Sequence, residues 1–252
     1  MCHYMIPLFK SHYSIGKSIL TLNPPGSSDP SGPDSIFDIL LDNKINNLFL
    51  IEDVPTGFLA ARKQSFANDI KFIFGLRMSF CCQLNEEPSQ HKCIIIAKSD
   101  NGCKLLNIIY SDIFCNFSGV GNFNLLKKYW SDADLMLCIP FYDSFLYKNS
   151  FTFSSCAPDF SFCDPIFFTE SNGLPIDSYL LDLVKTYCSK YGYQTLNSKS
   201  IYYKNRDDVE ALQTYKCICN RSFGRNKSLS NPMLEGFGSD EFCFESWLES
   251  QS

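Results

Sequence analysis

Short apolar runs alternate with amphipathic stretches along most of the chain. The apolar runs predict buried strands at 47–51, 71–75, 93–97, 135–139 and 166–169. The amphipathic stretches place their apolar side chains on one helical face and predict helices at 57–68, after 101–102, at 177–189 and at 207–219. Continuous apolar strands separated by such helices are typical of a parallel sheet covered by helices on its outer side. The pattern therefore predicts an α/β protein and favours a barrel of (β/α)7 type over an open sheet.

Two polar segments interrupt this pattern. Residues 27–34 (SSDPSGPD) predict an ordered loop that ends in a helix start at 33–35. Residues 224–238 are rich in Gly, Asn and Ser and predict a mobile loop before the terminal segment at 242–248. No internal repeat is visible. We therefore expect one barrel domain over 1–223, followed by a C-terminal loop and tail over 224–252.

The composition is that of a globular protein with a sizeable core, at 45% hydrophobic and 19% charged residues. The net charge of −5 argues against a general binder of duplex DNA, although it leaves room for a local basic pocket. No apolar stretch approaches the roughly 18 residues that span a bilayer, and the N-terminus has no signal-peptide pattern. We expect a cytoplasmic protein that does not bind membranes.

The chain has thirteen cysteines, and their expected redox state depends on the cellular compartment. Disulfide frameworks belong to secreted proteins, whereas a buried thiol behaves as a small hydrophobe. The pairs Cys81-Cys82 and Cys217-x-Cys219 lack the CxxC spacing of a zinc ribbon. Reduced thiols are therefore the preferred interpretation, and a zinc or redox role is the alternative.

Several segments follow one another in the order and spacing of a known family. Residues 7–18 (PLFKSHYSIGKS) place Ser11, Tyr13 and Ser14 in register with that family's opening motif. Further matching segments lie at 48–53, 72–77, 93–106, 173–175 and 201–211. Together they resemble the PHP (polymerase and histidinol phosphatase) domain of bacterial DNA polymerase III alpha subunits. The resemblance covers most of the chain and implies a distorted (β/α)7 TIM-like barrel of PHP type.

The resemblance also identifies the positions where an active PHP domain holds up to three metal ions. Such a site uses roughly nine His, Asp, Glu and Cys side chains at the C-terminal mouth of the barrel, whereas the whole chain has three His. In the first motif, Leu8 and Lys10 stand where the family has two histidines. At the later positions, Arg77 stands in place of a glutamate, Lys92 and Asn172 stand in place of histidines, and Ser200 and Tyr202 stand in place of the final aspartate and histidine. His12 is displaced by two residues from a ligand position, and Glu52 and Asp53 remain as acids in the second motif.

Protonated lysine and arginine cannot ligate a divalent cation, and their charge repels it. We therefore expect no catalytic residues and no metal cofactor, which would make the chain a pseudo-enzyme. Lys10, Arg77 and Lys92 are expected to form internal ion pairs with Glu52 or Asp53, because buried cations must be paired. In the alternative interpretation these cations form an anion pocket that accepts a phosphate.

The resemblance implies a role in DNA replication, as a non-catalytic structural or accessory subunit of a polymerase complex. The expected partner is a DNA polymerase or another replisome protein, with nucleic acid as a further candidate. A free-standing copy of this domain suggests a bacteriophage protein that acts in the cytoplasm of its bacterial host. The alternative is a metal-dependent 3′–5′ exonuclease or phosphoesterase with an atypical site for Zn or Mn. A third interpretation is a module that binds phosphate ligands.

Two further segments of the sequence are rich in aromatic residues. Residues 141–162 interleave aromatic residues with few charges, and only Lys148 is basic. We expect a packed long loop there, with a partner-protein surface as the alternative. Residues 241–248 form an acidic, aromatic tail that either docks on the barrel or binds another replication protein.

Overall fold

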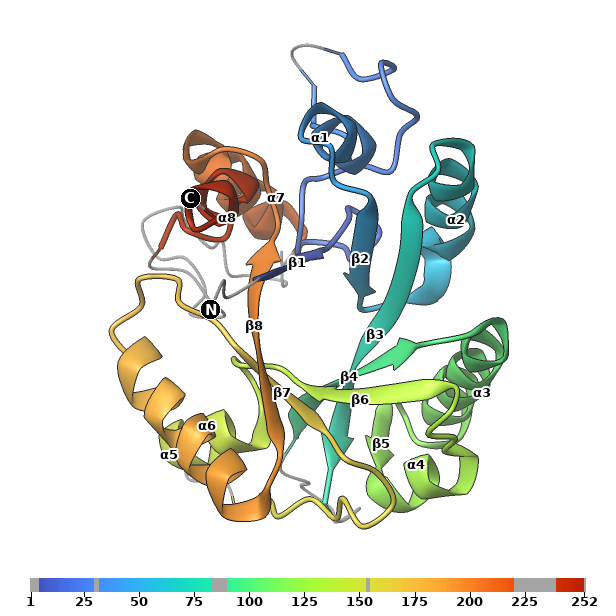
Figure 1. Ribbon diagram of the computed structural model, residues 1–252, viewed down its shortest axis with the longest axis vertical. Helices are drawn as coiled ribbons and strands as arrows, with labels where there is room; N and C mark the ends of the chain where they lie inside the picture. The colour runs from blue at the N-terminus through green and yellow to red at the C-terminus, as the bar shows by residue number, and fades with distance from the viewer. Residues whose placement is uncertain (1–4, 30–31, 83–89, 153–154, 220–238, 252) are drawn as a thin grey trace. The chain divides into compact units, whose positions relative to one another are not determined.

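The computed structural model describes residues 5–29, 32–82, 90–152, 155–219 and 239–251 (Figure 1). Its strands are β1 (Ile6–Phe9), β2 (Asn47–Glu52), β3 (Lys71–Cys81), β4 (His91–Ala97), β5 (Val120–Asn122), β6 (Leu135–Ile139), β7 (Ile166–Thr169) and β8 (Gln194–Ile201). Its α-helices are α1 (Ile36–Asp42), α2 (Phe58–Ala67), α3 (Asp100–Asn116), α4 (Phe123–Tyr129), α5 (Phe145–Phe151), α6 (Asp177–Tyr191), α7 (Val209–Cys219) and α8 (Phe244–Glu249). Two short 3₁₀ turns, η1 (Pro55–Gly57) and η2 (Arg206–Asp208), lead into α2 and α7.

The strand pairings close into a ring. The hydrogen-bonded order is β2-β1-β8-β7-β6-β4-β3, and β2 also pairs with β3, while β5 joins β3 outside the ring. β4 runs antiparallel to both of its neighbours, whereas β1–β2, β1–β8, β6–β7 and β7–β8 are parallel. The predicted α/β class is confirmed, and the pairings are those of a closed seven-stranded mixed barrel.

The expectation of a parallel sheet is wrong at β4. β3 extends to Cys81 and β4 begins at His91, so only residues 82–90 connect them. A parallel pair needs a crossover of a dozen or more residues, whereas an antiparallel pair can be joined by a short connection. The chain length between the two strands therefore favours the antiparallel arrangement.

The chain divides into two compact units, which we describe separately. The first comprises residues 1–73, 171–174 and 198–252, and the second comprises residues 74–170 and 175–197. The first unit contains β1, β2, α1, α2, α7 and α8, around buried side chains such as Phe9, Leu50 and Ile201. The second contains β4 to β7 and α3 to α6, around buried side chains such as Ile95 and Leu137. β3 and β8 each contribute residues to both units.

The predicted helices are present, and their starts follow local capping chemistry. α1 begins after Ser35, whose hydroxyl accepts a hydrogen bond from the Phe37 amide, and this confirms the helix start predicted at 33–35. Ser99 caps α3 in the same way through the Gly102 amide. None of the described helices is both long enough and apolar enough to cross a bilayer.

The 141–162 segment is not simply a long loop, because it contains α5. Ser144 caps this helix, and its first residue, Phe145, is buried against Phe160, Phe167 and Tyr187. Phe145 and Phe160 thus anchor the described part of this segment in the core of the second unit.

The terminal segment docks on the first unit. Tyr203 and Cys243 form a parallel bridge, and backbone hydrogen bonds join Tyr202 N to Phe242 O and Phe244 N to Tyr203 O, both at 3.0 Å. Phe242, Cys243 and Phe244 are buried, and the Phe244 ring stacks on Phe9. Of the two alternatives for this tail, docking is observed. The predicted domain boundary at 223/224 and the loop at 224–238 lie outside the described residues.

Candidate functional site

In the first unit, a lysine and an aspartate meet at the ends of two neighbouring strands. Lys10 directly follows β1, and Asp53 directly follows β2. The Lys10 Nζ lies 2.7 Å from Asp53 Oδ1, and the exposed fractions of the two side chains are 5% and 27%. The desolvated ammonium therefore has its counter-ion in direct contact, which offsets the cost of burying it.

Strand register explains why Asp53 is the acid that forms the ion pair with Lys10. Leu8 pairs with Phe49, so alternation along the strands places Lys10 and Asp53 on one face. Glu52 falls on the other face together with Phe9, whose ring stacks on Phe244 of α8. The side chains of Glu52 and Asp53, which are adjacent in the sequence, therefore lie in two different environments.

Glu52 is fully buried and collects the polar groups of the loop that follows β1. Its Oε1 accepts hydrogen bonds from the Ser11 amide at 2.9 Å and the Ser11 hydroxyl at 2.5 Å. Its Oε2 accepts one from the Ser14 hydroxyl, whose oxygen in turn accepts one from the Asp53 amide at 2.8 Å. The carboxyl group thereby fixes the 11–14 turn to the end of β2.

The environment of Glu52 favours its neutral form relative to water. Burial raises the pKa of this carboxyl above its usual value, and the charge of Lys10 and the Ser11 and Ser14 hydrogen bonds oppose the rise. Ser11 and Ser14 are themselves buried and are bonded to the carboxyl group. Such a cluster is suited to holding a turn in place.

The second unit contains a separate charged cluster centred on Asp143. The Arg77 guanidinium lies 2.7 Å from Asp143 Oδ2, and Lys148 Nζ lies 3.6 Å from Oδ1. The Lys92 amide donates to the Asp143 carbonyl at 2.7 Å, and Lys92 Nζ donates to Ser79 Oγ at the same distance. Asp143 was not singled out from the sequence, because it follows β6 in a segment without a recognisable motif.

Other predicted site residues have individual roles in the first unit. His12 Nδ1 lies 3.3 Å from the Leu20 carbonyl, and its ring packs on Tyr13 at 4.4 Å. Asn172 is buried, and Ser200 pairs in register with Leu8. The Tyr202 ring stacks on Phe242 at 5.7 Å, as part of the docking of the terminal segment.

A further buried cation, Lys199, was missed from the sequence. Its Nζ donates to the Ser171 carbonyl at 3.0 Å and lies 3.5 Å from Glu241 Oε2. Glu241 also accepts from Arg206, which in addition pairs with Glu249 of α8 at 2.6 Å. These contacts join the end of β8 to the terminal segment. No local spacing signals them, because 28 or more residues separate the partners.

Within the described ranges, no three His, Cys, Asp or Glu side chains converge in a way that could hold a metal ion. No protein-family model matches the chain, and no curated protein matches it in sequence. The PHP resemblance therefore stays a prediction.

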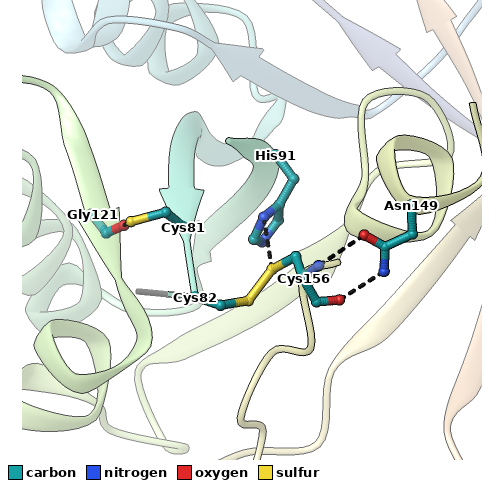
Figure 2. Close-up of a disulfide and its surroundings, with 6 residues drawn as sticks. All are labelled: Cys81, Cys82, His91, Gly121, Asn149 and Cys156. Carbon is teal, nitrogen blue, oxygen red and sulfur yellow. Dashed lines mark hydrogen bonds between the residues drawn. A yellow bond between two sulfur atoms is a disulfide. The ribbon is translucent and has the colours of Figure 1, made fainter. Parts of the chain in front are cut away.

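The expectation that all cysteines are reduced is wrong for one pair. Cys82, just after β3, and Cys156, in the connection between α5 and β7, form a disulfide with a Cα–Cα distance of 5.7 Å (Figure 2). Their separation of 74 residues explains why spacing did not reveal the pair. Free cysteines such as Cys93 and Cys138 are buried, as expected of thiols that act as small hydrophobes.

His91, at the start of β4, lies against this disulfide. Its Nδ1 is 3.4 Å from Cys156 Sγ, and its ring stacks on Phe123 and meets Phe145 edge-on. Burial lowers the pKa of His91 to about 4, so the imidazole is neutral at pH 7. Its neighbour Lys92 points to the opposite face of the strand, as the regular alternation predicted.

Proposed function

We propose that the chain is a non-catalytic accessory protein of DNA replication with a PHP-type barrel, resembling the PHP domain of bacterial DNA polymerase III alpha subunits. The motif segments follow the family's order over most of the sequence, and the strand pairings close a seven-stranded ring. Neither property alone defines a function, since proteins with one fold can have many different functions.

The observation that carries the proposal is the Lys10–Asp53 ion pair. At a position where the resemblance expects a metal-binding histidine, a buried ammonium contacts the carboxylate of the next motif at 2.7 Å. That contact engages the acid that a divalent ion would need and places a positive charge where the ion would bind. In the second unit, Arg77 stands where the resemblance expects a metal-binding glutamate, and it engages Asp143 at the same distance.

The same pairs favour internal ion pairing over an anion pocket. A phosphate would have to compete with carboxylates that already neutralise Lys10 and Arg77. The proposed role is therefore structural, and the proposed partner is a replicative polymerase or another replisome protein. The proposed setting is the cytoplasm of a bacterial host.

Three measurements on the purified chain test the proposal. They are metal content, 3′–5′ nuclease activity on a 3′-labelled single-stranded oligonucleotide with Mn²⁺ or Zn²⁺, and complex formation with a purified bacterial polymerase III alpha subunit. We expect a complex and no chelator-sensitive hydrolysis. A double variant, Glu52→Gln with Asp53→Asn, serves as the control, because activity that persists in it comes from a contaminating nuclease.

Two results would overturn the proposal in different ways. Stoichiometric Zn or Mn with nuclease activity that a chelator abolishes would favour the alternative, an exonuclease or phosphoesterase with an atypical site. Absence of a complex with the alpha subunit at micromolar concentrations would remove the argument for a polymerase accessory.

A further inference from the structure

The two halves of the Cys82–Cys156 disulfide have different surroundings (Figure 2). Cys82 is partly exposed at the end of β3, whereas Cys156 is buried. An external thiolate must approach one sulfur in line with the S–S bond, so access decides which sulfur it attacks. The difference in exposure therefore favours Cys82 as the attacked residue and Cys156 as the leaving group.

The leaving sulfur has a hydrogen-bond donor beside it. A disulfide sulfur carries no proton, so the hydrogen in the 3.4 Å contact between His91 and Cys156 belongs to His91 Nδ1. A hydrogen bond across this contact therefore requires the Nδ1–H tautomer. A thiolate is a much better acceptor than a disulfide sulfur, so this bond strengthens as negative charge develops on Cys156.

Cys156 is also held in position through its backbone. Asn149 Nδ2 donates to the Cys156 carbonyl at 2.7 Å, and the Cys156 amide donates to Asn149 Oδ1 at 2.9 Å. Both bonds are drawn in Figure 2. Asn149 lies on α5, so the helix fixes the buried cysteine, and the flanking Phe123 and Phe145 rings fix the imidazole.

We propose that Cys82–Cys156 is a thiol-exchange site whose substrates are small thiols of the glutathione class, with His91 stabilising the departing Cys156 thiolate. The external thiolate attacks Cys82 Sγ, a mixed disulfide forms, the Cys82–Cys156 bond breaks and Cys156 leaves with the bonding electron pair. A second thiolate then attacks the external sulfur of the mixed disulfide and releases Cys82 as a thiolate. Both cysteine thiolates take protons from solvent. The two external thiols supply the two electrons and end as one disulfide.

The experiment follows the opening of the disulfide by glutathione in the folded chain at pH 7.5. Samples are quenched with an alkylating reagent, and peptides containing Cys82 and Cys156 are quantified by mass spectrometry. We expect the rate to rise linearly with glutathione concentration. Replacing the hydrogen-bond donor by His91→Leu should slow opening by about tenfold or more, as expected for loss of a bond to a charged group.

Two matched variants separate a chemical effect from a structural one. His91→Asn keeps an N–H donor near the Nδ1 position and should stay within about threefold of the parent rate. His12→Leu removes a histidine that contacts the Leu20 carbonyl in the first unit and should leave the rate unchanged. Circular dichroism and thermal melts establish that each variant is folded.

A further measurement does not depend on any His91 variant. In Cys156→Ser, glutathione disulfide should form its adduct on Cys82, and in Cys82→Ser the buried Cys156 should react far more slowly. Equal labelling of the two cysteines, or a rate independent of thiol concentration and equal to that of global unfolding, would overturn the proposal. An unchanged rate in folded His91→Leu would do the same.

Discussion

The Trp247 indole nitrogen donates a hydrogen bond to the backbone carbonyl of Met5 at 2.9 Å, across 242 residues of sequence. The bond joins α8 to the residue before β1, within the first unit. The terminal segment is therefore part of the core that supports β1 and the Lys10–Asp53 pair.

The first prediction concerns this contact. Trp247 is 6% exposed and its neighbour Leu248 is 46% exposed. Trp247→Ala should lower the free energy of unfolding by about 3–5 kcal/mol, because it empties a large buried volume and leaves a carbonyl without its donor. Leu248→Ala should cost below about 1 kcal/mol. Urea denaturation of both variants measures the difference, and equal costs would mean that the tail is not docked in solution.

The second prediction concerns the Lys10–Asp53 ion pair. Asp53→Asn leaves the buried Lys10 ammonium with a weaker partner and should cost about 2–3 kcal/mol, less than for a fully buried pair because Asp53 is partly exposed. Adding Lys10→Met should recover part of that loss. A double-mutant cycle measured by urea denaturation gives the coupling energy, and a coupling near zero would contradict the pairing.

The third prediction separates the polar and the charged roles of Glu52. Glu52→Gln keeps an acceptor for Ser11 and should change stability little below pH 4.5, whereas Glu52→Leu should cost about 2–4 kcal/mol there through unsatisfied buried groups. The folded-state pKa is raised, so the contribution of Glu52 is complete below its usual value of 4.5 and is lost as pH rises above it. Unfolding curves of the parent and Glu52→Gln should therefore diverge above that pH. Parallel curves would contradict a raised pKa.

The fourth prediction concerns the pH dependence caused by His91. Its pKa in the folded chain is about 4, below the usual 6.5, so its contribution is present above pH 6.5 and is lost as pH falls through about 4. Relative to His91→Asn, the parent should lose about 3 kcal/mol of unfolding free energy over that interval. The difference between the two urea denaturation series isolates this residue, and a constant difference would mean that His91 is not buried in its neutral form.

The fifth prediction concerns a close backbone approach at the start of α3. A Cβ added to Gly102 would clash with the Asp134 carbonyl oxygen. Gly102→Ala should therefore destabilise the chain by about 1–3 kcal/mol despite the better helix propensity of alanine. Alanine at the exposed Asn107 on the same helix is the control and should have little effect in thermal denaturation.

Periodicity predicted most of the regular structure. The strand at 135–139 and the helix that begins after 101–102 are present, because their apolar spacing is imposed by burial on one face. The direction of β4 was missed because an apolar run carries no information about strand orientation. β5 and α4 were missed because segments of three and seven residues are too short for a periodic pattern.

The candidate site was predicted less completely, for a different physical reason. The identities of Lys10 and Asp53 could be obtained from motif order, but their pairing depends on strand register, which the shortened turn after β2 left open. The roles of Asp143 and Cys156 depend on contacts across 66 and 74 residues of sequence. Such contacts come from the tertiary fold, and a single sequence gives no local signal for them.

The strands β3 and β8 belong to both compact units, and the division between those units follows from four crossings of the chain, at 73/74, 170/171, 174/175 and 197/198. A single protease cut or a shortened gene would consequently release neither half as a complete body. To express one half alone, three segments of the first unit or two segments of the second would have to be joined by new linkers. Unfolding of either half would also leave the other half with incomplete β3 and β8 strands.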